Sequence, residues 1–176
     1  MRVMVDIEAV GPDGAIVSIG ACTFGTQGAS GEEFYVAVQT NTLWDNGFVA
    51  DPKTLSWWCR QDPGAREVLN DPDAVHIRHA LKKFRRWLKE VGATEIWSHD
   101  YDRRMLRDAY GKIGEACPWT YPKERDYRTL CELAGIGRIE GDKPHHALLD
   151  AMMQARHAEK ALEVLGNGRQ ERGVAL

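Results

Sequence analysis

Two acidic side chains interrupt an apolar stretch near the start of the chain, in "MVDIEAVG" at positions 4–11. Side chains two residues apart in a strand point to the same face, so Asp6 and Glu8 would stand about 6 to 7 Å apart on it. Two carboxylates that close repel each other unless the face is solvated or a divalent cation lies between them. Because an isolated Asp-x-Glu pattern is weak evidence for a metal site, other segments must supply further ligands.

Two other segments carry acids or histidines that could serve the same cation. In "WSHDYDRRML", Asp100 and Asp102 follow a short apolar run, at the end of a strand where open α/β sheets direct ligands. "HHALLDA" places His145 and Asp150 at the start of the last helical pattern. Oxygen-rich sites of this kind suit two hard cations such as Mg²⁺ or Mn²⁺, about 4 Å apart, which serve phosphoryl chemistry. A histidine beside the attacking water could accept its proton near neutral pH.

The elements that must position these residues alternate in type along the chain. Val, Ile and aromatic residues, separated by "GPDG" and "GTQGASG" turns, predict three antiparallel strands at 2–10, 15–24 and 32–38. A buried strand is expected at 94–99, and a fifth near 119–121 or, more weakly, near 125–127. Helical spacing and start signals predict helices at 51–61, 62–70, 71–92, 102–114, 127–135 and 145–166. This order predicts an α/β fold with one mixed sheet flanked by helices.

The composition is that of a folded domain. The chain has 176 residues, 43% of them hydrophobic and 28% charged, which suits one domain at 1–166 with a flexible tail at 167–176. A net charge of -3 disfavours a protein that coats long duplexes, but it suits an enzyme that grips a few nucleotides at one end. Scattered cysteines without a CxxC pair disfavour a zinc site and disulfides. No apolar run is long enough to span a membrane and no leader pattern occurs, so we expect a cytoplasmic protein.

The motifs together resemble the DEDDh branch of the DnaQ-like 3′-to-5′ exonucleases, most closely a subgroup of short bacterial and phage exoribonuclease-like enzymes. The matching segments, between residue 4 and about residue 160, are "DIEAVGPDGAIVSIGACTF", "LSWWCRQ", "IWSHDYD", "YRTL" and "HHALLDAMMQA". The resemblance implies an RNase H-like fold with a mixed five-stranded sheet. It implies a two-metal hydrolysis that releases nucleoside 5′-monophosphates, and it favours a homodimer. The implied ligands of two Mg²⁺ or Mn²⁺ ions are Asp6, Glu8, Asp102 and Asp150, and the implied general base is His145.

The second motif leaves its metal ligand open between two acids. "WSHDYD" is shorter than the glycine-containing loop that is usual in the subgroup, so Asp100 stays an alternative. Asp102 is favoured because Tyr101 supplies the aromatic residue that precedes the family's Asp.

The general base is open between two adjacent histidines. Five helical residues turn through about 500°, so His145 and Asp150 cannot share a helix face, and His145 must lie before the helix or in its first turn. His146 is four residues before Asp150 and would share its face in a helix, so it is the rival base. The resemblance favours His145.

Several side chains near these motifs are expected to contact the substrate. Adjacent helical tryptophans point about 100° apart, so one is expected in the core while the other could stack on a base. The backbone after Glu8 is expected to pass the terminal nucleotide, and the arginines after the second motif could meet phosphates. The basic run "KKFRRWLK" has apolar residues on one side and is expected to be a solvated helix face. The expected contacts are Ala9, Val10, Trp57, Trp58, Gln61, Tyr101 and Arg103.

These features predict a metal-dependent 3′-5′ exonuclease that acts on single-stranded RNA or DNA 3′ ends, with RNA favoured. Nothing in the residue types identifies a group that reads the 2′-hydroxyl. One alternative is a DNA-directed exonuclease of phage type. Another is a catalytically inactive nucleic-acid-binding module on the same fold, whose signature would be a missing carboxylate, and none is missing from the sequence.

Overall fold

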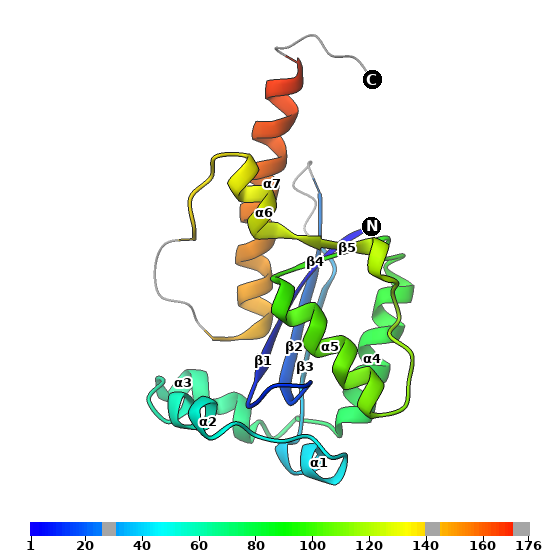
Figure 1. Ribbon diagram of the computed structural model, residues 1–176, viewed down its shortest axis with the longest axis vertical. Helices are drawn as coiled ribbons and strands as arrows, with labels where there is room; N and C mark the ends of the chain where they lie inside the picture. Colours follow the sequence, from blue (N-terminus) through cyan, green and yellow to red (C-terminus); the bar gives the residue numbers. More distant parts are fainter. Residues whose placement is uncertain (26–30, 140–144, 171–176) are drawn as a thin grey trace.

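A mixed five-stranded sheet organises the computed structural model, which describes residues 1–25, 31–139 and 145–170 (Figure 1). The sheet order is β3-β2-β1-β4-β5. Strands β1 to β3 are antiparallel neighbours, whereas β4 runs parallel to β1 and β5 runs parallel to β4. The strands are β1 (Arg2–Ala9), β2 (Ile16–Phe24), β3 (Glu33–Ala37), β4 (Glu95–Ser98) and β5 (Glu124–Asp126). This arrangement confirms the predicted α/β class and the mixed sheet.

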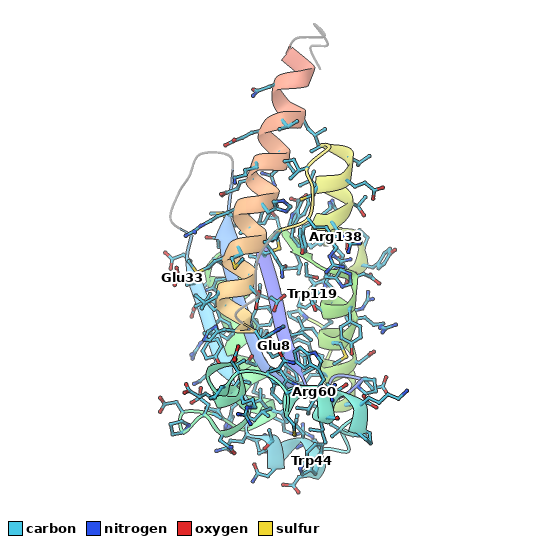
Figure 2. The ribbon with its side chains drawn as sticks, turned by 90° about the vertical axis from the view of Figure 1, so that its left-hand side faces the viewer. Glu8, Glu33, Trp44, Arg60, Trp119 and Arg138 are labelled. Carbon is cyan, nitrogen blue, oxygen red and sulfur yellow. The ribbon has the colours of Figure 1, made fainter. Side chains whose placement is uncertain are left out.

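Helices cover both faces of the sheet (Figures 1 and 2). They are α1 (Thr40–Asp45), α2 (Pro52–Trp58), α3 (Pro63–Arg66), α4 (Ile77–Glu90), α5 (Asp100–Lys112), α6 (Tyr127–Leu133) and α7 (Ala147–Gln170). Two short 3-10 helices are η1 (Glu67–Asn70) and η2 (Tyr121–Lys123). None of the helices in the described part of the chain is long and apolar enough to cross a membrane.

The alternation of β1 side chains divides the core into two layers. Val3, Val5 and Ile7 belong to the layer that includes Phe84 of α4 and Leu106 of α5. Met4 faces the other way, into a second layer with the buried alanines of α7 at 151, 155, 158 and 161. Side chains two residues apart share a face, so Asp6 and Glu8 lie on the same side of the sheet as Met4 and α7.

Several boundaries differ from the expected ones; α4 begins at Ile77 rather than at 71, and α1 lies where no helix was expected. The fifth strand forms at β5, the weaker of the two expected places, because Trp119 is buried against Phe84 and Tyr110 instead of pairing in the sheet. Helix α5 begins at Asp100 rather than at 102, since the His99 ring accepts a hydrogen bond from the Tyr101 backbone N–H and caps the helix. Helix α7 continues to Gln170, so 167–170 are helical, and the rest of the expected tail lies outside the described residues.

Candidate active site

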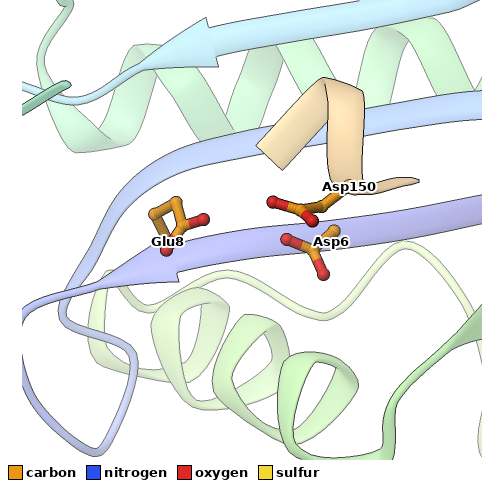
Figure 3. Close-up of side chains that lie close together, drawn as sticks. All are labelled: Asp6, Glu8 and Asp150. Carbon is orange, nitrogen blue, oxygen red and sulfur yellow. The ribbon is translucent and has the colours of Figure 1, made fainter. Parts of the chain in front are cut away.

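Three carboxylates from two elements meet on the α7 face of the sheet. Asp6 and Glu8 of β1 and Asp150 of α7 each offer an oxygen atom within 4.8 Å of the others (Figure 3). Glu8 and Asp150 are 8% and 5% exposed, so both are withdrawn from bulk water. Asp6 and Glu8 therefore share one face of the strand, as their spacing in the sequence predicted. The third acid, Asp150, lies 142 residues after Glu8 in the chain.

A glycine in β2 lets α7 come close enough to deliver Asp150. Gly20 pairs with Asp6 across β1 and β2. A Cβ atom at Gly20 would lie 2.1 Å from the carbonyl carbon of Ala147 and 2.1 Å from the backbone nitrogen of Leu148. The first turn of α7 thus rests directly on the sheet, at the level of the acids. Only a residue without a side chain permits this approach.

The start of α7 fixes Asp150 in place. Its carboxylate Oδ2 accepts a hydrogen bond from the His146 backbone N–H at 3.1 Å, and its own N–H donates to the His146 carbonyl at 2.9 Å. The carboxylate therefore satisfies one of the N–H groups left unpaired at a helix start, where the helix dipole also favours negative charge.

The second motif contributes Asp102 rather than Asp100 to the neighbourhood of these acids. Asp102 is 7% exposed, and its charge helps to raise the pKa of Asp6. The side chain of Asp100 is 79% exposed and forms an ion pair with Arg103 at 3.3 Å. Of the two alternatives, only Asp102 is both buried and electrostatically coupled to β1.

The clustered carboxylates repel one another. The pKa of Asp6 is raised well above its ordinary value of 3.8, first by burial and then by the charges of Asp102, Glu8 and Asp150. A hydrogen bond of 2.6 Å from Nε2 of Gln154 to Oδ1 of Asp6 acts in the opposite direction. A bound cation would relieve this repulsion, and a donor set made only of carboxylate oxygens fits hard divalent ions such as Mg²⁺ or Mn²⁺. The cluster is therefore one that could bind a divalent metal.

The two histidines before α7 take different positions. His145 lies before the helix, as the spacing requires, with a left-handed φ of 49°. Its ring meets Trp57 of α2 edge-on, with 4.8 Å between ring centroids. His146 stacks instead on Tyr35 of β3, with 4.5 Å between centroids and 21° between planes. His146 therefore directs its ring toward β3, although its carbonyl accepts the first helical hydrogen bond, from the Asp150 N–H.

Comparison with known proteins assigns the chain to a family. A family described as the 3′-5′ exoribonuclease Rv2179c-like domain matches residues 1–162. The chain belongs to this Rv2179c-like family. Membership makes it a hydrolase of the 3′-5′ exonuclease class.

A solved structure supports the fold of this Rv2179c-like chain. The structure of exonuclease X in complex with 5′ overhanging duplex DNA is similar with a TM-score of 0.54 and 15% sequence identity, over 94% of this chain and 93% of that one. At this identity the likeness shows the fold, which is the RNase H-like fold of DnaQ-like exonucleases. No curated protein matches the sequence.

The two tryptophans of helix α2 in this Rv2179c-like chain differ in their exposure and in their contacts. Trp58 is 1% exposed, and its ring N–H donates to the carbonyl of Ala9 at 2.9 Å. The expectation of a base contact is therefore corrected for Trp58, which joins α2 to the end of β1. Trp57 is half-buried, and it lies against both Trp58 and His145.

The other expected contacts from this region vary in accessibility. Val10 is 1% exposed, and both its N–H and its carbonyl form backbone hydrogen bonds, with Ala15 and Asp51. Its side chain therefore belongs to the core, which corrects the expected contact. Ala9 and Gln61 are partly exposed, and Gln61 donates its side-chain amide to the Trp57 carbonyl at 3.1 Å.

The phosphate contact expected for Arg103 is corrected as well. Arg103 is 5% exposed and pairs with Glu124 at 3.6 Å, and it donates to the carbonyls of Ser98 and Arg125. These partners join the start of α5 to β4 and β5, so Arg103 has no surface left for a phosphate. Tyr101 is 39% exposed and directly precedes the buried Asp102.

Two residues that shape the site had no role in the sequence interpretation, although both lie in the quoted motifs. Gln154 is 3% exposed and holds Asp6, and its position four residues after Asp150 on a helix could have placed it on the same face. Gly20 carries no such signal, because the close approach of α7 depends on a segment more than 120 residues away.

Proposed function

We propose that the chain is a divalent-metal-dependent 3′-5′ exonuclease that removes nucleoside 5′-monophosphates from single-stranded 3′ ends, with RNA favoured over DNA. The observation that carries the proposal is the convergence of the Asp6, Glu8 and Asp150 carboxylates within 4.8 Å. The name of the family supports the preference for RNA. The neighbour bound to duplex DNA supports a nucleic-acid substrate and makes DNA the rival polymer.

The acids would hold two Mg²⁺ or Mn²⁺ ions, with Asp102 as the fourth ligand. When bound, such ions supply charge for the attacking water and for the departing 3′ oxygen. Asp150 is held in position by the His146 N–H and Asp6 by Gln154, so neither needs to reorganise when a substrate arrives.

His145 would accept the proton of the attacking water. This role is supported by its position before α7 and its contact with Trp57, and by the stacking of the His146 ring on Tyr35. Trp57, Tyr101, Gln61 and the Ala9 backbone would contact the terminal nucleotide. Base stacking on an aromatic ring is worth about 1–3 kcal/mol and tolerates any sequence.

The decisive experiment follows the release of mononucleotides from end-labelled single-stranded RNA and DNA of one sequence, with Mg²⁺, with Mn²⁺ and with a chelator. We expect metal-dependent release from the 3′ end that is faster on RNA, and its loss in Asp6→Asn and Asp150→Asn. Faster cleavage of DNA would establish the rival substrate. Binding of both polymers without release by the unmodified protein would instead identify an inactive binding module.

The assignment of the base has its own comparison. We expect His145→Ala to lower kcat by about 10²–10⁴-fold, the usual contribution of a general base. His146→Ala removes a stacked ring but leaves its backbone N–H on Asp150, so we expect a loss below tenfold. The opposite ranking would make His146 the base.

The boundary of the domain at 166, the homodimer and the cytoplasmic location stay predictions. Light scattering of the purified chain checks the homodimer.

A further inference from the structure

A second cavity lies beside α6, away from the acidic cluster. It has a volume of about 620 Å³ and is enclosed by α6, the segment 136–139 and α7. Tyr127, Ile136 and Ile139 form an apolar wall, and His157 lines it from α7. Cavities of about 300–1,000 Å³ with apolar walls and a few polar groups are typical of sites for small organic groups such as a nucleotide. We call it the α6–α7 pocket.

The pocket carries positive charge in a chain whose net charge is negative. Arg128 and Arg138 line it, and Glu132 is the acid among its lining residues. Within the described part of the chain, neither arginine forms an ion pair, whereas Arg103, Arg107 and others are paired. Exposed guanidinium groups beside an apolar wall are a combination suited to a phosphate next to a base.

The pocket and the acidic cluster lie along one face of α7. Residues seven apart on a helix differ by only about 20° in direction, so Asp150 and His157 point the same way, separated by about 10 Å along the axis. Figure 2 shows Arg138 near α6, further along α7 than Glu8. Nδ1 of His157 is 3.3 Å from Sγ of Cys131, which leaves Nε2 for a ligand.

We propose that the α6–α7 pocket holds a nucleotide of the substrate strand upstream of the 3′ end, with its phosphate at Arg128 and Arg138 and its base against Ile136 and Ile139. The proposal rests on the proposed exonuclease function. It makes the enzyme prefer strands long enough to reach from the acidic cluster to the pocket. A dinucleotide occupies only the acidic cluster, so the pocket does not strengthen its binding.

The test compares kcat/KM on a dinucleotide and on a single-stranded dodecanucleotide of the same 3′ sequence. We expect Arg128→Glu and Arg138→Glu each to lower kcat/KM on the dodecanucleotide about tenfold more than on the dinucleotide, mainly through KM. Arg86→Glu is the control, since Arg86 lies on α4, 72% exposed, and pairs with Glu90. We expect it to leave the ratio between the two substrates unchanged.

A binding measurement separates the pocket from catalysis. In an Asp6→Asn background, fluorescence anisotropy with labelled dodecanucleotide should show weaker binding for each arginine variant. The slope of log K against log salt should fall by about 0.7 for each phosphate contact removed. Equal losses on both substrate lengths, or an unchanged salt slope, would overturn the pocket proposal. Failure of the exonuclease proposal looks different, because the unmodified chain would then hydrolyse neither substrate.

Discussion

Substitution of Gly20 by alanine tests whether the site depends on the approach of α7 to the sheet. The new Cβ would lie 2.1 Å from backbone atoms of Ala147 and Leu148, whereas ordinary contacts begin at 3.4 Å, so the helix must move by about 1.3 Å. Asp150 is on the same helical turn and would move away from Asp6 and Glu8. A misplacement of about 1 Å at a reacting centre can cost about 100-fold in rate, which is the loss of kcat/KM that we expect.

The assay must separate this displacement from a simple loss of stability. Overpacking costs about 1–3 kcal/mol, so rates should be measured well below the melting temperature, with circular dichroism showing a folded chain. Gly111→Ala is the matched control, because no atom lies within 4 Å of its Cβ position and alanine favours the helix that contains it. If Gly20→Ala keeps its activity within twofold of Gly111→Ala, the close approach of α7 does not control the site and this reasoning is wrong.

Three further predictions test other parts of the structure. Trp58→Ala should destabilise the chain by about 3–5 kcal/mol in denaturant unfolding, whereas Trp57→Ala should mainly raise KM; equal losses of stability would contradict the division of roles within α2. Arg103→Met leaves the buried Glu124 paired with Arg107 but removes the bonds to the Ser98 and Arg125 carbonyls, so we expect a loss of about 1.5–3 kcal/mol in the same measurement; a change below 0.5 kcal/mol would show that these contacts are dispensable. With a chelator present, the pKa of Asp6 in the folded chain lies above its unfolded value near 3.8. The protonated carboxyl group therefore stabilises the folded chain below about pH 3.8, and this stabilisation is lost as the pH rises through the folded pKa. Asp6→Asn should therefore raise the metal-free melting temperature at pH 7 and flatten its pH dependence, and a lower melting temperature would contradict the repulsion among the acids.

The sheet and the principal acids could be predicted from the sequence because their signals are local. Alternation along β1 puts Asp6 and Glu8 on one face, and the turn and helix signals bring the other motifs to the same sheet. The preference for Asp102 over Asp100 came instead from the family resemblance, in which an aromatic residue such as Tyr101 precedes the acid. The place of the fifth strand could not be predicted in this way, since aromatic residues at 119–121 favour a strand and a core position equally.

The residues that differed from expectation depend on partners that local patterns do not identify. Arg103 follows a metal-site motif and resembles a phosphate ligand, but Glu124, 21 residues later, pairs with it and buries it. Trp58 and Trp57 are equivalent in the sequence, and the carbonyl of Ala9 in another element decides which one is buried. Burial is a property of the assembled fold, so spacing can give a set of candidates but not the exposed fraction of each.

The site is built at the expense of local stability, and α7 supplies most of the compensation. Burial, and then the charges of Asp102, Glu8 and Asp150, raise the pKa of Asp6, and this crowding of acids is unfavourable without a cation. Against this repulsion, α7 contributes the N–H of His146 to Asp150, the amide of Gln154 to Asp6 and an alanine-lined face that packs closely on the sheet. Each of these contacts forms only at one position of α7 along the sheet and at one rotation of α7 about its own axis. The position of α7 on Gly20 therefore sets both the stability of the acids and the geometry that a cation would meet.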